Sequence, residues 1–272
     1  MSPSFLLLLI PIIPLSLLAI LSLIVRPKPI RIPIKSRHVF ITGGSSGIGL
    51  ALAHRAASEG ARVSILARSP QKLEEAKRSI KLATGVEVAI FSADVRDYDA
   101  VSKAVEESGP IDVLIVNQGV FTARELEKHS VEDVRFTIEV NLVGSFNVIK
   151  AALPRMKGRE GRGPGSISLV SSQAEQKSRP EVTAIIAASS GSMKTEEVAR
   201  RAMDGIKAGK FTVSCNFEGF LLSLATTGMS PQRSFWLAFL EVITAGPIRL
   251  VALFFQWDWY NAIEKWSKTK NK

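Results

Sequence analysis

A repeating pattern of short apolar runs and longer amphipathic stretches begins near residue 38. The apolar runs have the length of buried strands, and the amphipathic stretches have helical spacing. Strands are predicted at residues 38–42, 62–66, 86–91, 111–116 and 166–170. Helices are predicted at residues 50–59, 69–82, 97–108 and 130–153. This alternation predicts an α/β fold, a doubly wound parallel sheet of the Rossmann-like kind.

After the fifth predicted strand the pattern weakens. We expect a helix at residues 195–208, capped by Ser192 or Thr195, and one more strand at residues 211–214. Between the fifth strand and this helix, two serines at the end of the strand, Ser171 and Ser172, are followed by a charged segment at residues 175–181.

Two apolar segments flank the alternating pattern. Residues 4–25 carry no charge and are long enough to cross ~30 Å of hydrocarbon as a transmembrane helix, with a signal peptide as the alternative. Residues 235–257 are interrupted by Glu241, Pro247 and Arg249. For this C-terminal hydrophobic segment we expect a re-entrant or interfacial hairpin, with a buried helix pair as the alternative.

The patterns divide the chain into three parts. Residues 1–26 form a membrane anchor, residues 37–214 form a nucleotide-binding domain of the Rossmann-like kind, and residues 215–272 form a membrane-associated region. The net charge of +10 is concentrated beside both apolar segments, at residues 26–37 and 265–272. Such flanking charge indicates a membrane with the domain on the cytosolic side, and no zinc-finger or RNA-binding motif indicates nucleic acid.

The single cysteine, Cys215, excludes an intrachain disulfide and a thiol-metal site, and we expect no metal. A single cysteine in the chain fits a domain that faces the reducing cytosol. Lys268 and Lys270 resemble a dilysine signal for retrieval to the endoplasmic reticulum, with a solvated tail as the alternative.

The stretch TGGSSGIG at residues 42–49 joins the first strand to the first helix. Gly43 permits a tight turn, Gly47 lets the backbone approach a pyrophosphate, and Gly49 lets the helix pack on the strand. The helix N-terminus offers free N–H groups and positive potential to phosphates. The second strand ends in Arg68, with Lys72 one turn later, where an acidic residue would favour NAD. Cations at this position favour the 2′-phosphate of NADPH, although both can also be solvated charges.

Together these motifs resemble the short-chain dehydrogenase/reductase family over about residues 37–174. The matching motifs are residues 42–49, Asp94-Val95, Asn117-Gln118-Gly119 where the family usually has Asn-Ala-Gly, Asn141 in EVNLVG, and Ser171-Ser172. Within the family, residues 168–174 and 215–225 are most similar to the plant enzymes that reduce 3-ketodihydrosphingosine. The resemblance implies NADPH-dependent formation of dihydrosphingosine in sphingolipid biosynthesis, at the cytosolic face of the endoplasmic reticulum membrane.

The resemblance also implies roles for individual residues. The cofactor-binding residues would be Gly43, Ser45, Ser46, Gly47, Ile48, Gly49, Arg68, Lys72, Asp94, Val95, Asn117 and Gly119. Asn141 would anchor a water in the proton relay, and Ser172 or Ser171 would bond the substrate carbonyl.

The family's proton donor is a tyrosine in a Tyr-x-x-x-Lys motif, which this chain lacks. At the matching positions stand Ala184 or Ile185, and Ala188 or Ser189. The two tyrosines of the chain, Tyr98 and Tyr260, are followed at the lysine spacing by Ser102 and Glu264.

We therefore infer an internal deletion near residues 174/175 and a sheet that is incomplete after the fifth strand, with an exposed edge. The expected activity of this chain is weak or absent. The alternatives are a non-catalytic, membrane-bound NADPH-binding pseudoenzyme or partner subunit, and a reductase of the same family that acts on another lipid. A homo-oligomer is compatible with the resemblance.

Overall fold

The computed structural model describes residues 12–25, 30–121, 126–158, 161–171, 193–228 and 230–270. The chain divides into two compact units. One unit is Arg31–Ala208, and the other joins the two end segments, Met1–Ile30 and Gly209–Lys272.

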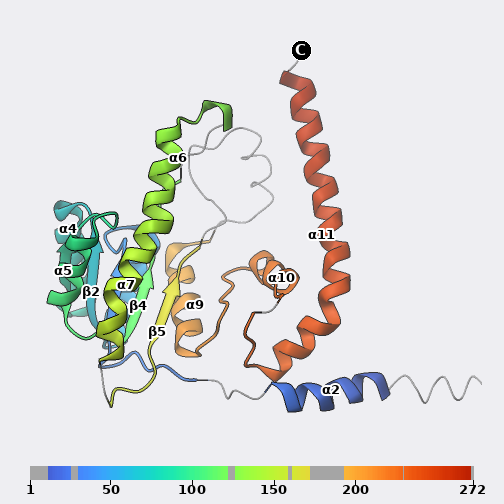
Figure 1. The fold of residues 1–272 in the computed structure, drawn as a ribbon, viewed down its shortest axis with the longest axis horizontal. Helices are drawn as coiled ribbons and strands as arrows, with labels where there is room; N and C mark the ends of the chain where they lie inside the picture. Colours follow the sequence, from blue (N-terminus) through green and yellow to red (C-terminus); the bar gives the residue numbers. More distant parts are fainter. Residues whose placement is uncertain are drawn as a thin grey trace, which may run out of the picture. The chain divides into compact units, whose positions relative to one another are not determined.

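The unit Arg31–Ala208 is built on a five-stranded parallel sheet (Figure 1). The strands are β1 (His38–Thr42), β2 (Arg62–Ala67), β3 (Ala89–Ser92), β4 (Val113–Val116) and β5 (Ser166–Leu169). Their order is β3-β2-β1-β4-β5, and every pair is parallel. This confirms the predicted fold class. The third and fourth strands begin later than predicted.

The order of the strands creates a switch point between β1 and β4. From β1 the chain moves outward to β2 and β3, then returns to place β4 on the other side of β1. The connections that leave the carboxyl ends of β1 and β4 lead to helices on opposite faces of the sheet, and we call the region between them at this edge the crevice. In open α/β sheets this is where ligands bind.

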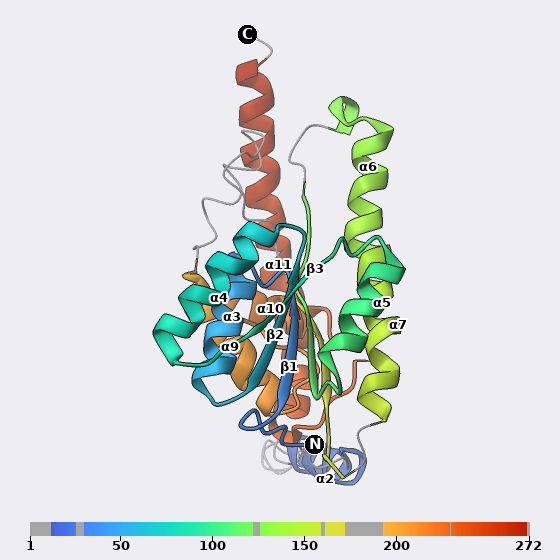
Figure 2. The same ribbon diagram turned by 90° about the vertical axis from the view of Figure 1, so that its left-hand side faces the viewer.

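Helices cover both faces of the sheet (Figure 2). One face carries α3 (Gly47–Ser58), α4 (Pro70–Thr84) and α9 (Thr195–Lys207), and the other carries α5 (Tyr98–Ser108) and α7 (Gly144–Lys157). Alternate strand residues point to opposite faces, so Ile41 packs under α3 whereas Phe40 packs under α5 and α7. Two apolar cores result.

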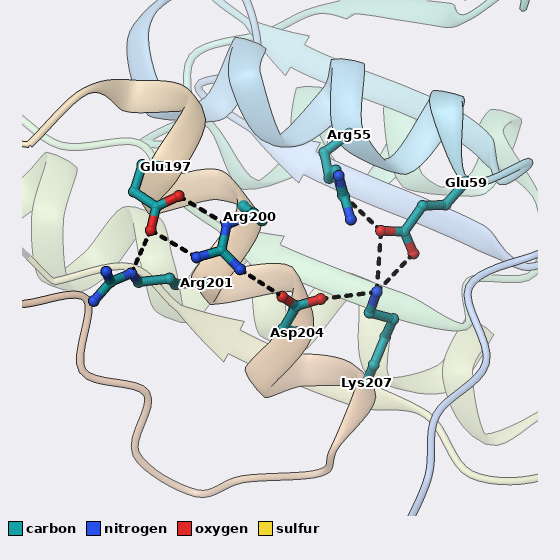
Figure 3. Close-up of polar contacts among 7 residues, drawn as sticks. All are labelled: Arg55, Glu59, Glu197, Arg200, Arg201, Asp204 and Lys207. Carbon is teal, nitrogen blue, oxygen red and sulfur yellow. Dashed lines mark hydrogen bonds and ion pairs between the residues drawn. The ribbon is translucent and has the colours of Figure 1, made fainter.

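The helix α9 is fixed against α3 by apolar and ionic contacts. Met203 is fully buried in the core that α3 lines. At the rim, Lys207 donates to both oxygens of Glu59 at 3.0 Å (Figure 3). The helix confirms the prediction for residues 195–208, but Thr195 is not its cap. The cap residue is Lys194, whose side chain makes no capping bond, and Ser192 lies outside the described residues.

The long helix predicted at residues 130–153 is divided into three parts. The helix α6 (Val131–Ile138) starts with a capping box of Ser130 and Asp133. A π-helical turn, η2 (Glu139–Val143), joins it to α7. The N–H of Gly144 bonds the carbonyl of Glu139, five residues back, as a π turn requires. The prediction of a long helix with little interruption is confirmed, since Val131–Lys157 is one continuous helical run, and the π turn at residues 139–143 is its irregular part.

The second unit contains α2 (Ile12–Ile24), α10 (Phe217–Ala225) and α11 (Phe235–Lys270). The predicted hairpin at residues 235–257 is wrong, because α11 continues through Pro247 without a turn. Proline removes one N–H from the helical ladder and need not end a helix. The alternative of a buried helix pair is also wrong, since most of α11 is exposed.

Two described helical stretches are long and apolar enough to cross a membrane by length and composition, namely Val131–Lys157 and Phe235–Trp266. The first packs on the sheet through α7. A shorter apolar helix covers Pro14–Ile24, and residues 4–11 of the predicted anchor lie outside the described residues.

The strand predicted at residues 211–214 is also wrong. These residues form no strand, and Phe211 is exposed. A strand needs a neighbour to pair with, and β5 is the last strand of the sheet in the described part of the chain. Residues 211–214 belong to the compact unit that contains α10 and α11.

Candidate active site

The turn from β1 into α3 is closed by glycines. Gly43 has φ +63° and donates its N–H to the carbonyl of Leu66 at 2.8 Å. A Cβ on Gly49 would lie 2.3 Å from the carbonyl oxygen of Gly43 and 2.5 Å from Nδ2 of Asn117. The start of α3 therefore packs directly on the turn, which only glycine permits at this position.

The N-terminus of α3 offers free backbone donors. Ser46 has an extended backbone and makes no side-chain capping bond, and the first helical bond runs from Leu50 N–H to the carbonyl of Ser46 at 3.2 Å. Among the described residues, nothing accepts from the amides of Gly47 and Ile48. Ser45 lies in the same turn, half-buried. Free amides with the positive end of the helix dipole suit a phosphate.

Two cations follow the carboxyl end of β2. Arg68 and Lys72 are both exposed, and within the described ranges neither makes an ion pair. Between them Ser69 caps α4, accepting the N–H of Lys72 at 3.3 Å. The side chains are therefore available to an anion at the edge of the crevice.

Asp94 follows β3 and is paired with Arg96. Nε and Nη2 of Arg96 lie 3.1 and 2.9 Å from the carboxylate oxygens, and the backbone N–H of Arg96 donates at 3.0 Å. These bonds, the Arg96 side chain foremost, lower the pKa of Asp94. Val95 is buried, and its side chain fills the space where a Cβ on Gly144 would lie.

The carboxyl end of β4 contacts the glycine turn. The N–H of Asn117 donates to Oγ1 of Thr42 at 3.0 Å, and its Nδ2 donates to the carbonyl of Gly43 at 3.4 Å. Gly119 faces Asn141, since a Cβ there would lie 3.5 Å from Oδ1 of Asn141.

Asn141 lies in the π turn and holds the loop after β4. Its Oδ1 accepts the N–H of Val120 and its Nδ2 donates to the carbonyl of Val120, both at 2.8 Å. The side chain is thus an anchor for this loop. Its role with a relay water stays a prediction.

Of the two candidate serines, only Ser171 lies within the described residues. Ser171 is exposed just after β5, where Val170 N–H bonds the carbonyl of Val116 at 2.9 Å. Ser172 and the junction at 174/175 lie outside the described residues.

Both tyrosines of the chain lie on helices. Tyr98 begins α5, with the ammonium of Lys150 4.7 Å from its ring centre, and it packs in the core under α5 and α7. Tyr260 lies on α11, in the other unit.

Sequence reasoning missed two features of the site, the π turn and the contacts of Gln118. The side chain of Gln118 bonds Thr42 and Ser145, across the base of the crevice. The available signal was Gln118 itself, which stands where the resembled family usually has alanine. Nothing in the apolar spacing of residues 131–157 distinguishes a π turn from an α-helix.

The arrangement has the chemistry of a dinucleotide cradle. It combines a glycine turn that brings backbone close, free amides, and two exposed cations at the next strand. No cluster of metal-ligating side chains occurs in the described ranges.

Comparisons with known proteins agree with this geometry. A family model described as short chain dehydrogenase matches residues 37–204. The chain is 75% identical to 3-dehydrosphinganine reductase TSC10A of Arabidopsis thaliana over 301 aligned positions, with 92% of each chain covered. It is 64% identical to TSC10B of the same plant, covering 94% of this chain and 93% of the relative.

A solved structure, the apo form of LigD from Sphingobium sp. strain SYK-6, is 24% identical with a TM-score of 0.53. The likeness covers 64% of this chain and 86% of that chain. At this identity it shows the fold alone.

Proposed function

Because the chain belongs to the short-chain dehydrogenase family, we propose that the crevice between β1 and β4 binds NADPH. The pyrophosphate lies on the free amides at the start of α3, and the 2′-phosphate lies on Arg68 and Lys72. The observation that carries this proposal is the pair of exposed cations at the end of β2, for which the described structure shows no direct ion pair, although the charge of Arg68 also acts on Asp94. No acidic residue stands at residues 67–69 to bond a ribose hydroxyl.

This position of the 2′-phosphate orients the whole cofactor. The adenosine half lies toward β2 and β3, near Asp94, and the nicotinamide half lies across the switch point toward β4 and β5. Asn117, Gly119 and Ser171 are on that second side. The residues present therefore fit a phosphorylated dinucleotide.

The substrate we propose by descent is 3-ketodihydrosphingosine, whose ketone is reduced to dihydrosphingosine. The high identity to TSC10A and TSC10B, both named 3-dehydrosphinganine reductases, supports this choice over other lipid ketones. NADPH supplies a hydride when bound. Ser171 or Ser172 would hold the ketone oxygen at the end of β5, and Asn141 would serve the proton relay by anchoring a water.

We expect little or no turnover from this polypeptide, since it lacks a tyrosine–lysine pair to donate the proton. Neither Tyr98 nor Tyr260 has a lysine at the family's spacing. An internal deletion near 174/175 accounts for the loss. The alignment to TSC10A supports it, because its 301 positions exceed the 272 residues of this chain and must include gaps.

A second candidate function follows from the same observations. A chain with an intact cradle and no proton donor is suited to act as a non-catalytic NADPH-binding partner subunit. Both candidates place the protein at the endoplasmic reticulum membrane with its domain in the cytosol. The apolar helices α2 and α11 and the basic residues beside them support this location.

The experiment is a calorimetric titration of the full chain with NADPH and NADH, followed by a turnover assay beside TSC10A. We expect NADPH to bind at least about tenfold more tightly than NADH, from charge-assisted bonds to the 2′-phosphate. We expect reduction of 3-ketodihydrosphingosine far below that of TSC10A. Equal affinity for the two cofactors would refute the cradle assignment, and a rate near that of TSC10A would refute the loss of activity.

A further inference from the structure

A continuous chain of hydrogen bonds runs from the end of β1 to the π turn, through the side chain of Gln118. The Thr42 hydroxyl lies within bonding distance of Gln118 Oε1. Gln118 Nε2 donates to Ser145 Oγ at 3.0 Å, and Ser145 Oγ donates to the carbonyl of Asn141 at 2.7 Å. Three separate elements, β1, the loop after β4 and the η2–α7 segment, are joined by this chain.

The direction of each bond follows from the donors and acceptors within reach, although the carbonyl of Ile115, 3.4 Å from Thr42 Oγ1, is a second acceptor for the Thr42 hydroxyl. Thr42 Oγ1 accepts the N–H of Asn117 at 3.0 Å, so its own hydrogen is free to go to Gln118 Oε1. The amide oxygen of Gln118 is thereby used as an acceptor, and its NH₂ group must face Ser145. Ser145, having accepted this bond, turns its hydrogen to the Asn141 carbonyl. Residue 118 completes this chain of hydrogen bonds only if its side chain ends in both an acceptor and a donor.

The far end of the chain of bonds controls the loop after β4. Asn141 belongs to the π turn, and its side chain bonds both polar backbone groups of Val120 at 2.8 Å. Ser145 therefore fixes the backbone of the residue whose side chain holds the loop. That loop, residues 117–121, leaves the carboxyl end of β4, on the side of the crevice given above to the nicotinamide half.

We propose that Gln118 is a positioning residue that couples the glycine turn to the loop beneath the nicotinamide half of the cofactor. This inference rests on the proposed NADPH site. It assigns to Gln118 a part in binding the nicotinamide half of the cofactor. Gln118 does not touch the reacting atoms in this account. It fixes the distance between the pyrophosphate turn, through Thr42, and the loop anchored by Asn141.

Two substitutions separate this role from simple packing. Gln118→Ala removes both bonds of the side chain and leaves the Ser145 hydroxyl without its donor. Gln118→Glu keeps the shape and the acceptor for Thr42, but a carboxylate cannot donate to Ser145. It would accept the Ser145 hydrogen instead and so take it from the Asn141 carbonyl. Ser145→Ala is the matched substitution, because it removes the acceptor of the bond from Gln118 Nε2.

The test compares NADPH with adenosine 2′,5′-bisphosphate, which carries the adenosine half and its 2′-phosphate but no nicotinamide. Both are titrated into the full chain and into the three variants. We expect each variant to bind NADPH about fivefold more weakly, the effect of one net hydrogen bond, and the fragment with unchanged affinity. The double variant of Gln118→Ala and Ser145→Ala should be no weaker than either single one, because both break one chain of bonds.

A second measurement needs no cofactor. Hydrogen exchange of a peptide that contains Val120 should be about fivefold faster in all three variants, because its N–H bond to Asn141 loosens. Unchanged NADPH affinity in Gln118→Ala and Gln118→Glu would overturn the proposal. Equal loss of NADPH and fragment, with a lower melting temperature, would also overturn it in favour of a general structural role. If the unmodified chain binds neither ligand, the proposed function itself fails, and the role of Gln118 in cofactor binding fails with it.

Discussion

The strands β4 and β5 are neighbours in one sheet and follow the same register, yet their surroundings differ. Val116 on β4 is 3% exposed, whereas its register partner on β5, Leu169, is 63% exposed. β4 has a strand on each side, and within the described residues β5 has one. The difference teaches that the strand sequences alone do not decide burial, because a strand also needs a second neighbour and a covering helix.

The two sides of the crevice differ in burial in the same way. The side proposed for the adenosine half rests on β1 and β2, which are almost wholly buried and hold the glycine turn. The side proposed for the nicotinamide half extends to β5, where Leu169 and Ser171 are exposed. Cofactor binding and proton delivery can therefore be lost separately. Substitutions on the two sides should therefore differ in their effects.

The largest effect is expected from matched leucine truncations. Leu114 on β4 is fully buried, so Leu114→Ala should lower the free energy of unfolding by about 2–5 kcal/mol through lost burial and a cavity. Leu169→Ala on β5 should change it by less than about 0.5 kcal/mol. Urea denaturation of the two variants measures both values. Similar losses would mean that β5 is covered in solution.

The next effect concerns the glycine turn. Gly49→Ala would place a Cβ 2.3 Å from the Gly43 carbonyl, so we expect about 3 kcal/mol of destabilisation, together with loss of NADPH binding. Gly47→Ala is the control for stability alone, because nothing in the chain lies within 4 Å of its Cβ, whereas that Cβ would stand where the pyrophosphate is proposed to approach. With φ +56° at Gly47, this control should cost only about 1 kcal/mol of backbone strain. Thermal denaturation measures the stability of both variants, and titration measures NADPH binding by Gly49→Ala.

A pH-dependent effect is expected at the amino end of β1. Burial lowers the pKa of His38 from 6.5 to about 4. The unfolded chain therefore takes up a proton near pH 6.5 that the folded chain takes up only near pH 4, so stability falls as the pH decreases across this interval. The loss should reach at most about 3 kcal/mol, at 1.36 kcal/mol for each pH unit.

Urea midpoints between pH 7 and pH 4 measure this loss. His38→Gln should remove that part of the pH dependence, because glutamine does not titrate. A flat profile in the unmodified chain would contradict the burial of β1 at this end.

The smallest effect is expected on cofactor choice. Arg68→Ala should reduce the preference for NADPH over NADH about tenfold, since one charge-assisted contact to the 2′-phosphate is lost. Lys72→Ala should reduce it less, because an ammonium makes no bidentate contact. Titration of both cofactors into each variant gives the ratio. An unchanged ratio of the two affinities in Arg68→Ala would contradict the assignment of the 2′-phosphate to the end of β2.

The five strands could be predicted from the sequence, because short apolar runs bounded by glycine and charged residues usually form buried strands. It was insufficient where a contact partner decides the outcome. Residues 211–214 have the composition of a strand, and no neighbouring strand is available to them in the described fold. Pro247 suggested a turn, whereas the helix α11 continues through it.

Site prediction had the same limit. Glycines and cations could be read locally, since turn geometry and charge belong to single residues. The clamp of Asn141 on Val120, and its link to Gln118, depends on elements that meet only in the fold.

The central claim is an intact NADPH cradle in a chain that cannot deliver the proton. The most direct measurement adds 3-ketodihydrosphingosine to the full chain saturated with NADPH and follows the fluorescence of the bound cofactor over time. The account predicts a saturable rise in fluorescence on binding and a constant signal after the ketone is added. No rise, or a decay at the rate given by TSC10A, would contradict it.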